Sequence, residues 1–138
     1  MSNISFEKIW EDEEMFEIEI LVKNEYISAK KTCYLQQDSL IEFSNFTSDF
    51  VSNSAEEKKI KWGISLENGN TECEFSILPM NKQGHIFINI SMVQVEGQYY
   101  NTTSLYIETE IGLLESFGKN IFSHLEKVGN KICLNLEQ

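Results

Sequence analysis

The chain has 138 residues, 41% of them apolar, which is enough for one domain with a substantial core and too few for two ordinary domains. It carries 22 acidic and 11 basic residues, a formal net charge of −11, and every basic residue is a lysine. Nucleic acids and anionic membranes bind clustered positive charge, and phosphates favour arginine, so this composition argues against both kinds of partner. The acidity suits a basic protein partner, although an ordinary soluble domain can be equally acidic.

The N-terminal segment does not read as an export signal, because Met1 to Trp10 has no positively charged start followed by a long apolar run. No apolar stretch is long enough to cross a bilayer. The three cysteines, Cys33, Cys73 and Cys133, lie far apart and are expected to be reduced thiols. The sequence therefore predicts a cytoplasmic protein without a membrane partner.

The first 35 residues predict an arm followed by two strands. Residues 1–14 are expected to form an N-terminal arm that ends in a solvated acidic loop, made by Glu11, Asp12, Glu13 and Glu14. Apolar and polar residues then alternate over 15–23 and 27–35, which is typical of half-buried strands. Lys31 interrupts the inward apolar set of the second strand, and this predicts a bulge or an exposed strand end.

A helix is predicted next, with Asp38 as its N-cap, because a carboxylate can accept hydrogen bonds from the free N–H groups of a first turn. Its apolar residues recur at helical spacing and are expected to pack on the sheet. They are Leu40, Phe43, Phe46 and Phe50, and Thr47 lies on the same stripe.

The stretch from Lys59 to Glu110 predicts a meander of four antiparallel strands. Asn68-Gly69 is a strong signal for a two-residue hairpin turn, since both residues tolerate positive φ. That turn would make one face of the first two strands entirely apolar. The expected cross-strand pairs are Ile64 with Cys73, Trp62 with Phe75, and Ile60 with Ile77.

A second helix is predicted over residues 110–128, closed by Gly129-Asn130. Gly118 lies beside its apolar stripe and indicates a close approach of this helix to the sheet. Alternation over residues 132–136 predicts a short edge strand. The fold class is therefore α+β, a single domain over residues 1–138. Its mostly antiparallel, twisted sheet has about six strands in the order β-β-α-β-β-β-β-α, with two helices on one face.

No motif for catalysis, metal binding or cofactor binding is present. His85 and His124 lie in different predicted elements, and neither has a cysteine or acid beside it at a metal-ligand spacing. A nucleophile motif of the G-x-S-x-G type and a phosphate-binding glycine loop are both missing. Carboxylates are abundant, but nothing singles out an acid–base pair, so the sequence predicts a protein that is not an enzyme.

The open face of the predicted sheet combines carboxylates with aromatic residues, a mixture that suits binding to a basic partner. Its residues are Glu17, Glu19, Glu72, Glu74, Phe87, Tyr106 and Glu108, with Tyr34 and Asn89 among them. An ordinary solvated sheet face is the simpler explanation of these residues taken alone. An alternative surface is formed by Glu11, Asp12, Glu13, Glu14, Glu96, Tyr99 and Tyr100.

With these elements placed, the sequence resembles the WapI-type immunity proteins, small bacterial domains that neutralise a polymorphic toxin made by the same cell. The resemblance runs from about Phe16 to Leu125, and Gly84-His85-Ile86-Phe87-Ile88-Asn89-Ile90 is its most distinctive piece. The remaining motifs are Tyr34-Leu35, Leu40, Phe43, Trp62, the run from Leu105 to Glu110, and Leu113-Leu114. The resemblance implies a cytoplasmic binding protein without catalytic residues. Its partner would be a cognate toxin domain, often a nuclease.

Two other classes stay open from the sequence. One is a small-molecule-binding or enzymatic α+β domain with a pocket between helix and sheet, lined by Cys33, Cys73 and Trp62. The other is an adaptor or oligomer built through an exposed sheet edge.

Overall fold

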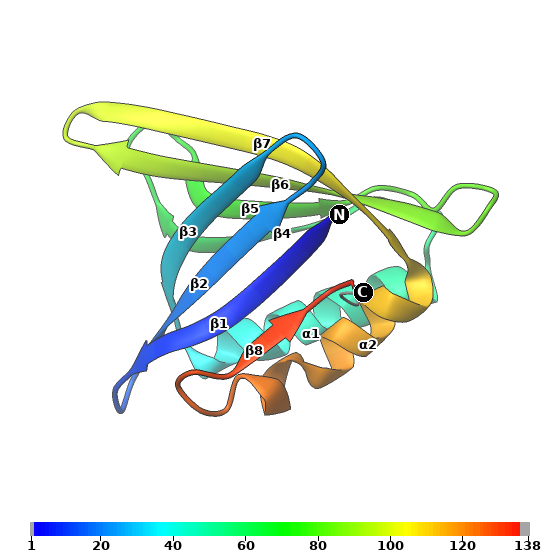
Figure 1. Ribbon diagram of the computed structural model, residues 1–138, viewed down its shortest axis with the longest axis horizontal. Helices are drawn as coiled ribbons and strands as arrows, with labels where there is room; N and C mark the ends of the chain where they lie inside the picture. The colour runs from blue at the N-terminus through cyan, green and yellow to red at the C-terminus, as the bar shows by residue number, and fades with distance from the viewer. Residues whose placement is uncertain (1, 136–138) are drawn as a thin grey trace.

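The computed structural model describes residues 2–135 and has an α+β fold with eight strands and two helices (Figure 1). The strands form two antiparallel sheets of four. The elements are β1 (Asn3–Glu11), β2 (Phe16–Lys23), β3 (Ser28–Leu35), α1 (Gln37–Ser52), β4 (Lys58–Ser65), β5 (Thr71–Ile77), β6 (His85–Glu96), β7 (Tyr99–Glu110), α2 (Ile111–His124) and β8 (Lys131–Cys133). Sheet A has the order β3-β2-β1-β8, and sheet B is the meander β4-β5-β6-β7.

The α+β class and the antiparallel pairing are confirmed, but the sheet is divided in two and has more strands than expected. The predicted N-terminal arm is strand β1, which lies between β2 and β8. Its side chains Ile4 and Phe6 are fully buried, so this segment belongs to the core. The predicted C-terminal strand is present as β8, while Leu136 lies outside the described residues.

One aromatic cluster joins both sheets and both helices. Phe6 of β1 lies with its ring centre 5.2 Å from Trp62 of β4 and 5.8 Å from Phe75 of β5. The same ring lies 5.6 Å from Phe43 of α1 and 5.2 Å from Phe117 of α2. Burying a side chain of this size contributes about 1.5–3 kcal/mol. The inner faces of sheets A and B therefore share one core, and their outer faces point to different sides.

The β4–β5 hairpin forms, but its predicted register is wrong by two residues. The loop has three residues instead of two, because Leu66 N–H donates to the Asn70 carbonyl (2.7 Å) and Gly69 takes a φ of +86°. A bulge follows at Gly63, whose φ of +90° favours glycine. The pairs are consequently Lys58 with Ile77, Ile60 with Phe75, and Trp62 with Cys73. A shift of two keeps Ile60 and Trp62 on their predicted face, which is why the apolar face survives there.

Lys31 does not create a bulge or an exposed strand end, contrary to the sequence prediction. The pairing of β2 with β3 is regular through this position, and Lys31 is 9% exposed. Its Nζ lies 3.8 Å from a carboxylate oxygen of Glu72 in sheet B. An opposite charge makes burial of a lysine tolerable, so the ion pair replaces the expected irregularity.

Both helices bury the predicted apolar stripes, with corrections at their ends. Helix α1 begins at Gln37, so Asp38 lies in its first turn and is not the N-cap. Helix α2 ends at His124, and Val128 is exposed in the turn that leads to β8. The close approach at Gly118 is to the other helix and not to the sheet. A Cβ at Gly118 would overlap the Thr47 hydroxyl of α1 and lie 2.8 Å from the Thr47 Cβ.

Candidate protein-binding site

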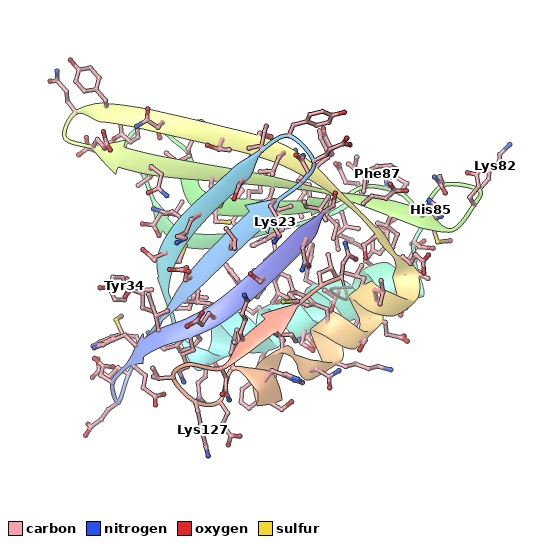
Figure 2. The ribbon with its side chains drawn as sticks, viewed as in Figure 1. Lys23, Tyr34, Lys82, His85, Phe87 and Lys127 are labelled. Carbon is pink, nitrogen blue, oxygen red and sulfur yellow. The ribbon has the colours of Figure 1, made fainter. Side chains whose placement is uncertain are left out.

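The structure divides the predicted binding surface between the two sheets. Glu17, Glu19 and Tyr34 lie on the outer face of sheet A, where Glu17 pairs in register with Tyr34. The other predicted residues belong to sheet B: Glu72, Glu74, Phe87, Tyr106 and Glu108. Figure 2 shows Tyr34 at one end of the molecule and Phe87 with His85 at the other. The expected single acidic face is therefore wrong, because the two strand groups form separate sheets.

On sheet B, the acidic residues lie close to basic side chains of the same chain. Glu74 lies 3.9 Å from Lys61, and Glu108 accepts a hydrogen bond of 2.8 Å from His85 Nδ1. Glu72 is only 20% exposed and pairs with Lys31. Between these pairs lies a neutral network in which Asn89 donates to the Ser104 hydroxyl at 3.0 Å. The sheet B face therefore offers little uncompensated negative charge.

The β1–β2 hairpin is different, because its charge is strongly one-sided. Residues 3–23 contain seven of the chain's 22 acidic residues and two of its 11 lysines. We use the name acidic corner for the end of this hairpin with its neighbour on β3: Trp10, Glu11, Asp12, Glu13, Glu14, Glu17 and Tyr34. Thus Glu17 from the first predicted surface and the acidic run from the second lie together.

The acidic corner also displays two large aromatic side chains. Trp10 pairs in register with Glu17, and Glu17 pairs with Tyr34, so the three residues form a row across β1, β2 and β3. The Trp10 and Tyr34 ring centres are 6.0 Å apart at an interplanar angle of 85°. Trp10 is 42% exposed and Tyr34 is 54% exposed.

A bulge in β1 places Trp10 on this outer face. The register shifts between Lys8, which faces Ile18, and Trp10, which faces Glu17. Lys8 consequently points inward, where its Nζ pairs with Glu11, donates to the Glu126 carbonyl at 3.3 Å and lies 5.0 Å from the Phe16 ring centre. Unbroken alternation would have turned Trp10 into the core, so the sequence pattern did not reveal it as a surface residue.

The turn at the acidic corner is fixed by Asp12. Its carboxylate accepts hydrogen bonds from the backbone N–H groups of Met15 and Glu14, each 2.8 Å long. These bonds, that of Met15 first, stabilise the charged form and hold the pKa of Asp12 below its usual value. The turn thus presents its carboxylates on an ordered backbone.

The rest of the alternative surface, Glu96, Tyr99 and Tyr100 at the β6–β7 hairpin tip, lies apart from the acidic corner. Tyr99 is highly exposed there, and it pairs in register with Glu96. The hairpin is long, and its tip projects beyond the rest of sheet B (Figure 1). With one carboxylate beside Tyr99 and Tyr100, the tip lacks the charge density of the corner.

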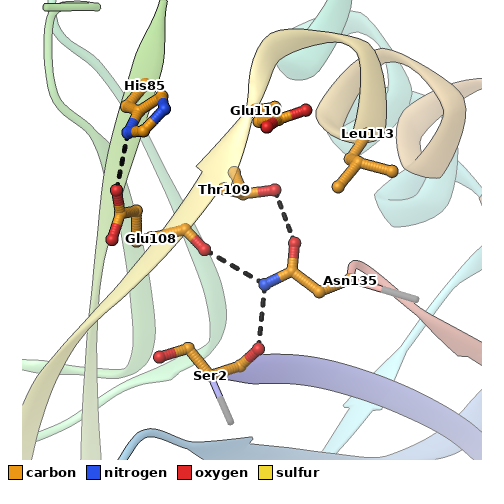
Figure 3. Close-up of a pocket in the computed structure, with 7 residues that line it drawn as sticks. All are labelled: Ser2, His85, Glu108, Thr109, Glu110, Leu113 and Asn135. Carbon is orange, nitrogen blue, oxygen red and sulfur yellow. Dashed lines mark hydrogen bonds and ion pairs between the residues drawn. The ribbon is translucent and has the colours of Figure 1, made fainter. Parts of the chain in front are cut away.

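A shallow depression of about 330 Å³ lies where β6 and β7 meet the start of α2 (Figure 3). The Asn135 side chain lies in this depression, and its amide nitrogen donates to the carbonyls of Ser2 (2.8 Å) and Glu108 (3.0 Å). It also accepts from the Thr109 hydroxyl at 2.7 Å. These groups satisfy one another and hold the two ends of the described chain against β7. We interpret the depression as a structural clasp, with His85 and Glu110 at its rim.

The pocket that a small-molecule-binding domain would need between helix and sheet is filled by side chains. The cavity found there measures about 10 Å³, room for no more than a single water, and is lined by apolar residues such as Phe43 and Leu114. Cys33, Cys73 and Trp62 are buried but do not line this cavity. Burial, with the nearby Glu72 carboxylate, raises the pKa of Cys33 to about 12, so its thiol is neutral and unreactive near pH 7.

Within residues 2–135, no group of three or more His, Cys, Asp or Glu side chains is arranged to hold a metal ion. Neither of the described helices is long and apolar enough to cross a membrane.

No protein-family model matches the chain, and a search of curated proteins found no match. Among solved structures, the chain is similar to the "Structure of the plant transcriptional regulator PBF-2". The two have 9% sequence identity and a TM-score of 0.47, over 89% of this chain and 74% of that one.

Proposed function

We propose that this protein is an immunity protein, which binds a basic toxin domain and blocks it by occupying its active site or substrate groove. The carrying observation is the acidic corner, where five carboxylates lie near two exposed aromatic rings and, among the described residues, only Glu11 pairs with a lysine. The proposal also agrees with the sequence resemblance to the WapI-type immunity proteins. A nuclease is the toxin class that such a surface suits best, because a nuclease needs a positive groove to hold its phosphate substrate.

The carboxylates of the acidic corner would speed association with a basic partner, and its aromatic rings would hold that partner once bound. Opposite fields accelerate encounter by about tenfold or more at low salt. Exposed tryptophan and tyrosine then supply the buried contacts that dominate interface energies. The carboxylates would lie where the nuclease otherwise binds nucleic acid, so binding and inhibition would be one event.

The test is to purify the toxin domain encoded next to this gene and to measure its binding and its nuclease activity with and without this protein. We expect a complex at micromolar concentration or below, and loss of nuclease activity at equimolar inhibitor. Absence of both a complex and inhibition at micromolar concentration would refute the proposal.

Matched charge reversals locate the interface. Glu13→Lys with Glu17→Lys changes the acidic corner by the same charge as Glu74→Lys with Glu108→Lys changes sheet B. We expect the first pair to slow association at least about tenfold at low salt and the second to have a much smaller effect. The opposite order would place the interface on sheet B. Glu72 is unsuitable for this test, because its reversal would leave the buried Lys31 beside a like charge.

A further inference from the structure

We infer that the row Trp10–Glu17–Tyr34 is a receptor for one arginine side chain on the surface of the basic partner. This inference rests on the proposed function, and it names the chemistry of the contact at the centre of the proposed interface. The evidence is the geometry of the row, the absence of a described group that covers it, and its charge.

The row has a carboxylate between two rings. Glu17 lies on the middle strand, with Trp10 opposite it on β1 and Tyr34 opposite it on β3. The rings stand nearly perpendicular, at 85°, with centres 6.0 Å apart. Because this is an edge-to-face contact, the rings leave no gap between them, and a flat cation would stack on the exposed surface of one ring and reach the carboxylate beside it.

The row stays open among the described residues. Both helices lie behind sheet A, and the outer face of β1, β2 and β3 has no element in front of it (Figure 1). The lysines of β1 and β3 have other partners, since Lys8 pairs with Glu11, Lys30 lies 3.9 Å from Glu19, and Lys31 pairs with Glu72. No described lysine pairs with Glu17, so the row has a charge and two apolar rings that a partner can complete.

Arginine fits this row better than lysine does. Its guanidinium is planar, stacks on aromatic faces and donates two parallel hydrogen bonds to one carboxylate. A lysine ammonium is a compact, strongly hydrated point charge, so it gains less from the rings. An apolar partner would bury the Glu17 carboxylate without compensation, which costs free energy. The occupant is therefore an arginine on a partner protein.

The test uses short peptides as probes and the two tryptophans as reporters. The probes are acetyl-Gly-Arg-Gly-Arg-Gly-amide and the same peptide with lysine or citrulline in place of arginine. Binding is followed by NMR of the two indole N–H groups at about physiological ionic strength, where weak long-range attraction is screened. Trp10 is exposed and Trp62 is 2% exposed, so Trp62 serves as the internal control.

We expect the arginine peptide to shift the Trp10 signal and not that of Trp62, with affinity about fivefold or more above the lysine peptide. The neutral citrulline peptide should show no saturable binding. Glu17→Gln and Tyr34→Ala should each weaken the arginine peptide about fivefold or more, while Tyr34→Phe keeps the ring and retains binding.

Glu108→Gln is the matched control, because it removes the same charge from sheet B. If it weakens binding as much as Glu17→Gln does, only the overall field attracts the peptide and the inference is wrong. Equal affinity for arginine and lysine would also overturn it. The two proposals can fail separately: a toxin complex unaffected by Glu17→Gln removes the arginine receptor, and arginine binding without a toxin complex removes the immunity function.

Discussion

Replacement of Gly118 by alanine tests the packing of the two helices. An alanine normally stabilises a helix interior by about 1 kcal/mol relative to glycine. Here the added methyl group would overlap the Thr47 hydroxyl and lie 2.8 Å from the Thr47 Cβ. Thr47 is 1% exposed, and its hydroxyl donates to the Ser44 carbonyl within α1 at 2.9 Å, so it has little freedom to move.

The clash should outweigh the gain in helix propensity. Overpacking of a rigid core usually costs about 1–3 kcal/mol, and an overlap with a β-branched side chain belongs at the upper end. After the gain of about 1 kcal/mol is subtracted, we expect Gly118→Ala to lower the free energy of unfolding by about 1–2 kcal/mol. For a chain of this length, that corresponds to a decrease of roughly 3–8 °C in Tm.

Urea unfolding followed by far-UV circular dichroism measures the effect. Gly112→Ala is the control, because a Cβ at Gly112 in the same helix meets nothing within 4 Å. We expect the control to be neutral or stabilising. Thr47→Ala should recover part of the loss in the double variant, since it removes the overlapping hydroxyl. A Gly118→Ala variant as stable as the original protein would refute the close approach of α1 and α2.

Four further predictions concern the clasp, the thiols and the acidic turn. Asn135→Ala should lower the free energy of unfolding by about 1–3 kcal/mol, because it leaves several polar groups of the clasp without partners, and an unchanged urea midpoint would contradict this role. With Ellman's reagent, Cys133 should react in the native protein while the buried Cys33 and Cys73 react only on unfolding; three fast thiols would show that the core is open. Because folding raises the pKa of Cys33 from 9.0 to about 12, its contribution to stability should be lost between those pH values, as a pH series of urea midpoints would reveal. Folding lowers the pKa of Asp12, so its contribution to stability is present above the unfolded pKa and disappears as the pH falls through the folded pKa. NMR titration of this carboxylate measures the folded pKa, and a midpoint at or above 3.8 would disprove the turn hydrogen bonds.

Most of the strands and both helices follow from residue periodicity, because each buries one face. The meander β4 to β7 and the stripe of α1 were predictable for this reason. The register of the β4–β5 hairpin was not, since the three-residue loop and the bulge at Gly63 depend on backbone conformation. The loop and the bulge each shift the register by one residue. A total shift of two leaves the side chains on the same face but changes which residues pair, so the hydrophobic pattern could not reveal it.

The division of the strands into two sheets could not be predicted from the local pattern of apolar and polar residues either. Alternation shows that a strand has an inner face, but it does not show which strands share a sheet. Lys31 and Glu72 lie far apart in sequence and meet only where sheet A approaches sheet B. Trp10 lies on the surface because of a bulge in β1, and the residues of β1 do not predict that bulge. The acidic corner was therefore present in the sequence as two unconnected hypotheses.

The pairing of β1 with β8 has a consequence for synthesis. Asn3 and Asn135 hydrogen-bond to each other across 132 positions, so the last described residues complete a sheet whose central strand is made first. Until β8 emerges from the ribosome, one edge of β1 has no partner, and such an edge can pair with other chains. Contacts this distant in sequence also form slowly, because a long loop must close first. We expect the nascent protein to depend on chaperones, and shortening it before residue 131 should cause aggregation in place of a smaller folded product.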